Sequence, residues 1–253
     1  MAVGLSTKDL TVDFEVPGGG SLPALGPITF AITPGHFVCL VGPSGSGKST
    51  LVRVFAGLQR ASHGSAWVGE IQVKKPLPQV GMMFQNANLM PWRTIRDNIA
   101  LPLELQGIGE EKRYQAVETL LPTLGLQEFA DALPAEVSGG MAQRAALGRV
   151  MIQKPEVLLL DEPFGALDAL TREKVSFDLL HIWEKYQQTA LMVTHDIQEA
   201  VLLSDRVLVL SQRPGKIIAD IGINLPRPRP NEIVYDEHFI SKTRLVREAI
   251  DRA

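Results

Sequence analysis

The strongest constraint on the fold of this chain is a glycine-rich loop that follows a short, wholly apolar segment. Residues Phe37–Val41 form an unbroken apolar run, which is typical of a strand buried on both faces of a parallel sheet. The next segment, GPSGSGKST at residues 42–50, fits the pattern G-x-x-x-x-G-K-[ST]. A helical pattern begins at Ser49 and stops near Gly57. This order of strand, loop and helix predicts an α/β fold around a parallel sheet.

The same loop is the first functional signal, because its residue types suit a bound phosphate chain. Glycines allow backbone N–H groups to point inward, and the following helix adds its positive end to the same cavity. Lys48 is expected to reach the β- and γ-phosphates, and the Ser49 hydroxyl to bind Mg²⁺. A glycine-rich turn with an incidental lysine is the alternative, and the complete spacing argues against it. The predicted nucleotide contacts are Gly42, Pro43, Ser44, Gly45, Ser46, Gly47, Lys48, Ser49 and Thr50.

Apolar segments of strand length recur later in the chain. They lie at residues 157–160, 190–193 and 207–210. Helical patterns separate them, notably from Thr171 to Tyr186, where apolar residues recur on one face. Buried strands that alternate with helices predict a largely parallel core sheet. Residues 10–16 and 28–32 have the pattern of short strands before this core.

Two acidic residues follow the apolar segment at 157–160. Ligands bind outside the carboxyl ends of strands in open α/β sheets, and Asp161 and Glu162 are at such an end. Asp161 is then suited to bind Mg²⁺ through water, and Glu162 to orient or deprotonate an attacking water. Alone, the pair could equally cap the following helix. The glycine-rich loop earlier in the chain favours the catalytic interpretation.

Charge and composition narrow the possible partners. The formal net charge is −3, so the chain lacks the basic character of a general nucleic-acid binder. Cys39 is the only cysteine, which excludes an internal disulfide and favours a reducing compartment. The N-terminus has no signal-peptide pattern, and no apolar stretch approaches the roughly 20 residues that span a bilayer. Any membrane association is therefore expected to come through a partner.

A further set of short motifs gives the chain a family resemblance. The segment VSGGMAQR at residues 137–144 resembles the signature of ABC ATPases, which usually begins with leucine where this chain has Val137. It precedes the Asp161–Glu162 pair, as in that family. Gln85 resembles the Q-loop glutamine, the ALD triplet ending at Asp168 the D-loop, and His195 the switch histidine. Each motif alone is weak, whereas their joint order indicates an ABC ATPase.

The resemblance implies both a fold and a set of site residues. The fold would be a P-loop NTPase (RecA-like) core with an antiparallel β subdomain and an inserted α-helical subdomain. Phe14 is similar to the aromatic residue that stacks on adenine, although the usual residue is tyrosine and a glycine-rich loop follows it. ATP and Mg²⁺ are the implied ligands, with Ser49, Gln85 and Asp161 near the metal. Glu162, His195 and Gln85 are the implied catalytic residues.

The family pattern also implies assembly. Two copies would pair head to tail, so that Ser138, Gly139, Gly140 and Asp168 of one copy complete the ATP site of the other. Separate transmembrane permease subunits would place the pair at the cytoplasmic face of the cell membrane. The segment 86–94, with Met90 and Trp92, would help to form the groove for a permease helix, unless these two residues pack inside the helical region.

Within the family, the chain resembles importers of nitrate, sulfonate, taurine and related solutes, which also have a solute-binding protein. The resemblance rests on LMPW at 89–92, LDALTR at 167–172, EAVLLSDR at 199–206 and RPGK at 213–216. Such an importer motor is the predicted function, and the sequence leaves the cargo open. Motors of exporters or lipid transporters remain alternatives, as do ABC ATPases of DNA repair or translation and a module that binds ATP without turnover.

The predicted organisation is a single ABC ATPase domain over residues 1–253. Residues 1–85 and 150–215 would form the α/β core with its β subdomain, 86–149 the helical subdomain and 216–253 a C-terminal tail. Within the tail, PRPRP at 226–230 is predicted to be a stiff, solvated linker, and residues 236–252 a charged amphipathic helix.

Overall fold

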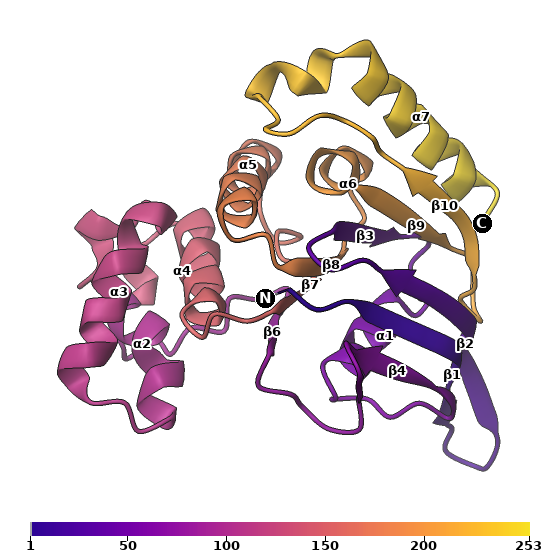
Figure 1. Cartoon of the computed structure of the whole chain (residues 1–253), viewed down its shortest axis with the longest axis horizontal. Helices are drawn as coiled ribbons and strands as arrows, with labels where there is room; N and C mark the ends of the chain where they lie inside the picture. Colours follow the sequence, from indigo (N-terminus) through magenta and orange to yellow (C-terminus); the bar gives the residue numbers. More distant parts are fainter. Residues whose placement is uncertain (1) are drawn as a thin grey trace.

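The computed structural model describes residues 2–253, in which two β-sheets lie beside a group of helices (Figure 1). The smaller sheet is antiparallel, with the order β2-β1-β4-β5: β1 (Leu5–Glu15), β2 (Ser21–Ile32), β4 (His63–Val68) and β5 (Ile71–Gln72). The larger sheet has the order β10-β9-β3-β8-β7-β6: β3 (Phe37–Val41), β6 (Val80–Met83), β7 (Val157–Asp161), β8 (Thr189–Val193), β9 (Arg206–Leu210) and β10 (Ile217–Gly222). From β9 to β6 each strand is parallel to its neighbour, whereas β10 is antiparallel to β9. The predicted α/β fold is confirmed.

The central strands of the parallel core, β3, β7 and β8, are fully buried because both faces of the sheet are covered. In β3, Phe37 and Cys39 pack into one apolar cluster, whereas Val38 and Leu40 pack into another on the opposite face. The first face is covered by α5 (Ala169–Tyr186) and α6 (Ile197–Leu203), and the second by α1 (Lys48–Phe55) and the antiparallel sheet. This two-sided burial explains why these strands are unbroken apolar runs in the sequence.

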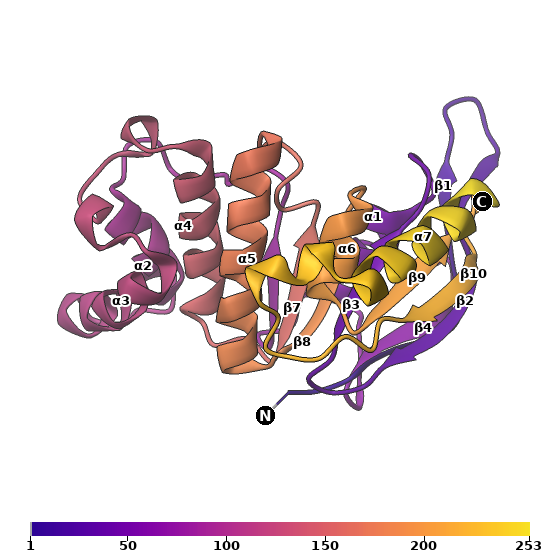
Figure 2. The same ribbon diagram turned by 90° about the horizontal axis from the view of Figure 1, so that it is seen from above.

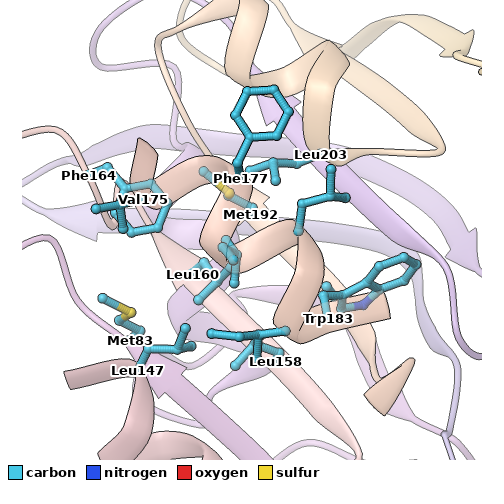
Figure 3. Close-up of a cluster of buried hydrophobic side chains, with 14 of the residues drawn as sticks. Met83, Leu147, Leu158, Leu160, Phe164, Val175, Phe177, Trp183, Met192 and Leu203 are labelled. Carbon is cyan, nitrogen blue, oxygen red and sulfur yellow. The ribbon is translucent and has the colours of Figure 1, made fainter. Parts of the chain in front are cut away.

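The core under α4 and α5 is a continuous set of large apolar side chains (Figure 3). Leu158 and Leu160 of β7 lie at its centre, with Met83 of β6 and Met192 of β8 from the neighbouring strands. Trp183 of α5 packs edge-on against Phe37, with ring centroids 5.5 Å apart. These contacts fix the end of β7, where Asp161 and Glu162 lie.

The inserted segment forms a helical lobe beside the sheets (Figure 1). It consists of α2 (Ile95–Leu105), α3 (Glu110–Leu124), the short helices η1 (Gln127–Phe129) and η2 (Pro134–Glu136), and α4 (Gly139–Met151). Helix α2 begins where the Thr94 side chain accepts a hydrogen bond from the Asp97 N–H. Helix α4 packs against β6 and α5, so its N-terminal residues are positioned relative to the core.

The tail lies on the core and ends in α7 (Glu237–Asp251), after η3 (Asn231–Tyr235). Helix α7 crosses over α6, β9 and β10 (Figure 2). Its own side chains Phe239 and Val246 are buried. None of the helices formed by residues 2–253 is long and apolar enough to cross a bilayer.

The prediction that residues 226–230 form a solvated linker is wrong. Arg229 is only 1% exposed, and its guanidinium donates to the carbonyls of Val201 (3.1 Å), Leu202 and Ser204 (2.9 Å) at the end of α6. Carbonyls at a helix C-terminus lack hydrogen-bond donors within the helix, and Arg229 supplies those donors. Its neighbour Arg227 stacks over the Trp183 ring, 4.3 Å from its centroid. The two arginines thus bind the tail to the core.

Candidate active site

A cavity of about 530 Å³ opens at the loop between β3 and α1. Most of the predicted loop contacts line it: Gly42, Ser44, Gly45, Gly47, Lys48, Ser49 and Thr50. Glu162 and His195 line the same cavity from the ends of β7 and β8, and Phe14 and Ala24 from the antiparallel sheet. Of the remaining loop residues, Ser46 is fully buried and Pro43 does not line the cavity. Residues far apart in the sequence therefore meet at one opening.

The loop takes its shape from glycine at the turn into α1. Gly47 has φ of +88°, and a Cβ there would lie 2.8 Å from the Ala24 carbonyl oxygen. Any other residue would be strained and would clash with β2. Helix α1 starts directly after Gly47, and no side chain caps its N-terminus. Its first N–H groups are thereby left available to an anion.

Lys48 is the buried cation of the loop. Its ammonium group donates to the carbonyls of Gly42 (2.9 Å) and Pro43 (2.8 Å), so the side chain folds back along the loop. Burial lowers the pKa of Lys48, and the nearby carboxylates Glu162 and Asp161 oppose that shift. A cation that is partly desolvated and lies along a loop of backbone N–H groups is suited to a polyphosphate.

Asp161 is buried and does not line the cavity. The Ser49 hydroxyl donates to Asp161 Oδ1 at 2.6 Å, which links α1 to the end of β7. Residues 2–253 contain no cluster of three or more His, Cys, Asp and Glu side chains that could bind a metal unaided. The hydroxyl and carboxylate suit Mg²⁺, which keeps several waters and takes substrate phosphate oxygens as further ligands. This donor set fits a magnesium ion that arrives with a nucleotide.

Glu162 and His195 lie next to each other in the cavity lining. Glu162 Oε2 lies 3.5 Å from His195 Nδ1, and both side chains remain partly accessible to solvent. Gln85 does not line this cavity, but its side chain is close to Glu162. A Cβ added to Gly165 would lie 3.1 Å from Gln85 Nε2 and 3.5 Å from Glu162 Oε2. The three candidate catalytic side chains therefore come from the ends of three neighbouring strands, β6, β7 and β8.

Phe14 lines the cavity from β1. Its side chain is 39% exposed, which leaves a ring face available for stacking. The pairing of Phe14 with Leu22 of β2 fixes it beside the strand that carries Ala24. A flat aromatic surface beside a phosphate-type loop is suited to a nucleobase.

The signature residues do not reach this cavity within one copy of the chain. Ser138 and Gly139 are exposed at the start of α4, and the Ser138 hydroxyl accepts from the Met141 N–H at 3.3 Å. Gly140 is buried against α5, where an added Cβ would lie 2.8 Å from Thr171. Asp168 is an exposed cap of α5, and its hydrogen bonds with Thr171 lower its pKa. The exposed helix N-terminus of α4 is available to a group from outside the chain.

Sequence reasoning missed Arg172, which links the segment after Glu162 to the segment that carries His195. Its guanidinium donates to the carbonyls of Phe164 (3.3 Å) and Leu167 (2.9 Å) and pairs with Asp196 at 3.4 Å. Asp196 directly follows His195 and caps α6. An arginine in a helix gives no sequence signal for such a link, because its partners are set only by the packing of α5 against α6.

A buried carboxyl group lies beneath the same segment. Glu199 accepts hydrogen bonds from the Ser176 hydroxyl at 3.1 Å and from the Thr194 hydroxyl. Burial raises the pKa of Glu199 to about 7, although these hydrogen bonds oppose the shift. Thr194 directly precedes His195. Glu199 therefore connects α5 to the loop of the histidine.

A second hollow, of about 480 Å³, lies between α2, α4 and the segment after β6. Asn86 and Ala87 line it, as do the exposed apolar side chains of Phe84 and Leu105. Trp92 is 73% exposed, so it does not pack inside the helical lobe, and neither Trp92 nor Met90 lines the hollow.

Comparison with known proteins identifies relatives over most of the chain. The family described as ABC transporter matches residues 25–165. The nitrate import ATP-binding protein NrtD of Synechocystis sp. is 47% identical over 207 residues, which cover 82% of this chain and 78% of that protein. An ABC transporter ATP-binding protein of Methanocaldococcus jannaschii is 43% identical over 229 residues, which cover 90% of this chain and 85% of that protein. The bicarbonate transport ATP-binding protein CmpC of Synechocystis sp. is 44% identical over 95% of this chain, which spans 37% of CmpC.

Two solved structures of an ABC transporter cassette also resemble this chain. The dimeric structure of MJ0796, a bacterial ABC transporter cassette, has a TM-score of 0.76 and 29% identity, and covers 88% of this chain and all of that one. A dimeric post-hydrolysis state of the same cassette, bound to ADP and phosphate, has a TM-score of 0.75 and 28% identity, with the same coverage.

Proposed function

The chain belongs to the ABC transporter family as an ATP-binding subunit, and on that premise we propose that its ATP hydrolysis drives import of a small solute through separate membrane-spanning subunits. The observation that carries the proposal is the single cavity shared by the phosphate loop, Glu162 and His195. A cavity that only stored a nucleotide would not need a carboxylate and a histidine beside the phosphate end.

In this proposal each residue has a defined contact with ATP. Phe14 stacks on the adenine, and the loop N–H groups and Lys48 bind the phosphates. Glu162 orients the attacking water and accepts its proton, while His195 contacts the γ-phosphate. Ser49, Gln85 and Asp161 would hold Mg²⁺, which neutralises charge on the phosphates when it is bound.

We further propose that two copies enclose two ATP molecules. The exposed Ser138, Gly139 and Asp168 lie outside the cavity of their own chain, which supports a role opposite a second copy. A serine hydroxyl and glycine N–H groups at the start of α4 are donors suited to a γ-phosphate. The dimeric form of the MJ0796 cassette supports this arrangement. Closure on ATP and opening after hydrolysis would be the two states that a partner senses.

The hollow between α2 and α4 is the proposed site for the permease. Phe84 is 41% exposed and Leu105 is 79% exposed, so the rim of this hollow offers apolar surface to a partner helix. The relatives named for nitrate import and bicarbonate transport support a small-solute importer. We propose a solute-binding protein as a further partner, one that delivers the solute to the permease. The subunit would then lie at the cytoplasmic face of the membrane, bound through the permease.

The test is to tag the chain in its own cells, solubilise the membranes gently and identify the proteins that co-purify. Recovery of a multi-span permease, together with a solute-binding protein, is expected. Leu105→Ser should reduce that recovery and spare basal ATPase activity, whereas Tyr235→Ser, which removes an equally exposed side chain elsewhere (79%), should not. Recovery of soluble partners only, with ATPase activity intact, would refute the transporter assignment.

A further inference from the structure

One cation in the nucleotide cavity has no role in the function proposed above. Arg213 lines the cavity from the turn between β9 and β10. Its Nε donates to the carbonyl of Gly45 at 3.4 Å, and a Cβ on Gly45 would lie 3.9 Å from its Nη2. Arg213 is therefore next to the outer edge of the phosphate loop, and Lys48 is the other lysine or arginine that lines the cavity.

The turn that carries Arg213 is fixed to the nucleotide site on two sides. The Gly215 N–H donates to the Ala24 carbonyl at 3.1 Å, and the Gly26 N–H donates to the Gly215 carbonyl at 2.9 Å. Gly215 also packs so closely against the phosphate loop that an added Cβ would overlap the Ser46 carbonyl oxygen. A side chain larger than glycine would move the turn away from the loop. The backbone contacts of Gly215 thus hold position 213 beside the phosphate loop.

The guanidinium is also not used elsewhere in the protein. Other arginines in the C-terminal part of the chain are paired, Arg206 with Asp220 at 2.5 Å and Arg227 with Asp205 at 2.9 Å. Arg213 forms no ion pair with the rest of the chain from residue 2 onward. Its five N–H donors make one hydrogen bond, to Gly45. An arginine that remains unneutralised beside a loop built for phosphate has the chemistry to bind an anion.

We infer that Arg213 is a further nucleotide-binding residue, which contacts the phosphate chain of ATP and ADP from the outer side of the phosphate loop. The inference rests on the proposed ATP site and adds a residue to it. Arg213 lies at Gly45, whereas Glu162 and His195 mark the proposed hydrolytic end. The contact is therefore made equally in the ground state and the transition state, so Arg213 contributes to nucleotide affinity and leaves the chemical step unchanged.

The test is titration calorimetry of the full chain with ATP or ADP in the presence of Mg²⁺, together with steady-state ATPase kinetics. Arg213→Ala should weaken the binding of both nucleotides about fivefold, the size expected for one solvent-exposed charged contact. The KM for ATP should rise by a similar factor while kcat stays the same. Arg213→Lys should recover part of the affinity, because lysine keeps the charge and loses the planar fork.

Lys216→Ala is the matched control, since it removes one positive charge from the same turn at a residue that does not line the cavity. It should bind both nucleotides as the wild type does. An unchanged affinity in Arg213→Ala, or an equal loss in Lys216→Ala, would overturn the inference while the proposed ATP site stands. Failure of the wild type to bind ATP would overturn both. If Arg213→Ala lowers the melting temperature, Arg213→Gln, which keeps the length of the side chain better, replaces it in the comparison.

Discussion

The backbone conformation of Glu162 determines where its side chain lies. The residue has φ of +48°, a left-handed conformation that is uncommon outside glycine, directly after the buried strand β7. This turn leaves Oε2 in the cavity, 3.5 Å from His195 Nδ1. A strained backbone at a cavity is the kind of local feature that proteins retain at reactive sites.

We predict that Glu162→Gln binds ATP as the wild type does and hydrolyses it at least about 100-fold more slowly. Glutamine keeps the shape and cannot accept the proton of the attacking water, and positioned general bases contribute factors of this size. Titration with ATP and a phosphate-release assay measure the two quantities. Glu173→Gln, an exposed acid outside the cavity, is the control. Undiminished turnover in Glu162→Gln would remove this residue from the role of base.

Protonation of Glu199 makes the unfolding free energy depend on pH. Burial raises its pKa in the folded protein to about 7, well above the usual glutamate value near 4.5. The folded state therefore binds the proton more tightly than the unfolded state does. The stability from this group is complete below about pH 4.5 and declines as the pH rises towards 7. The charged groups that face it are Asp196 and Arg172.

We predict that Glu199→Gln gains stability relative to the wild type as the pH rises from 5 to 8. The amide is neutral throughout, so it avoids the cost of a buried charge, which is at most about 3 kcal/mol for a shift of this size. Urea unfolding at several pH values measures the difference in unfolding free energy. A difference that is constant with pH would show that Glu199 is not the titrating group.

The site residues differ in how far sequence alone could identify them. Lys48 and Ser49 are neighbours in a short sequence pattern whose spacing is required for phosphate binding, so they could be predicted together. Arg213 could not, because it reaches the same cavity only through hydrogen bonds of the turn with Ala24 and Gly26. Those contacts join segments nearly two hundred residues apart and leave no periodic trace in the sequence.

At the scale of elements, the buried strands and the C-terminal helix α7 were predictable, and the docking of the segment 226–230 was not. Strand β7 is covered on both faces, so its sequence is a plain apolar run. The segment 226–230 has proline at every second position, a composition that is typical of linkers. Its docking depends on the free carbonyls at the end of α6, which hydropathy patterns do not record. The prediction failed because the binding partner of Arg229 is backbone.

We predict that Arg229→Met lowers the unfolding free energy by about 2 kcal/mol, the cost of leaving buried carbonyls without donors. Methionine fills much of the space, and it also relieves the buried charge, whose cost is visible in the lowering of the Arg229 pKa to about 10. Chemical denaturation measures the change. Arg244→Met, on an exposed part of α7, should have little effect. Equal stability in both variants would mean that the tail is not held by Arg229.

At the scale of the whole molecule, the proposed ATP site is divided between two surfaces of the chain. The cavity has a phosphate loop, a base and a histidine, whereas the exposed donors at Ser138 and Gly139 lie on the helical lobe, outside it. In the dimer that we propose, a second copy turned head to tail brings those donors to the nucleotide. The antiparallel sheet, the parallel sheet and the helical lobe were all expected from sequence patterns and family resemblance. Their relative placement, which leaves the donors exposed, required the structure.

The most direct test of this account is light scattering on Glu162→Gln, which is expected to trap bound ATP. Saturating ATP with Mg²⁺ should double the molar mass from the 27.6 kDa of one chain. Adding Ser138→Arg, which places a bulky cation in the proposed interface, should leave the mass at that of one chain while ATP still binds. A Glu162→Gln protein that is saturated with ATP and keeps the mass of one chain would contradict the shared ATP site.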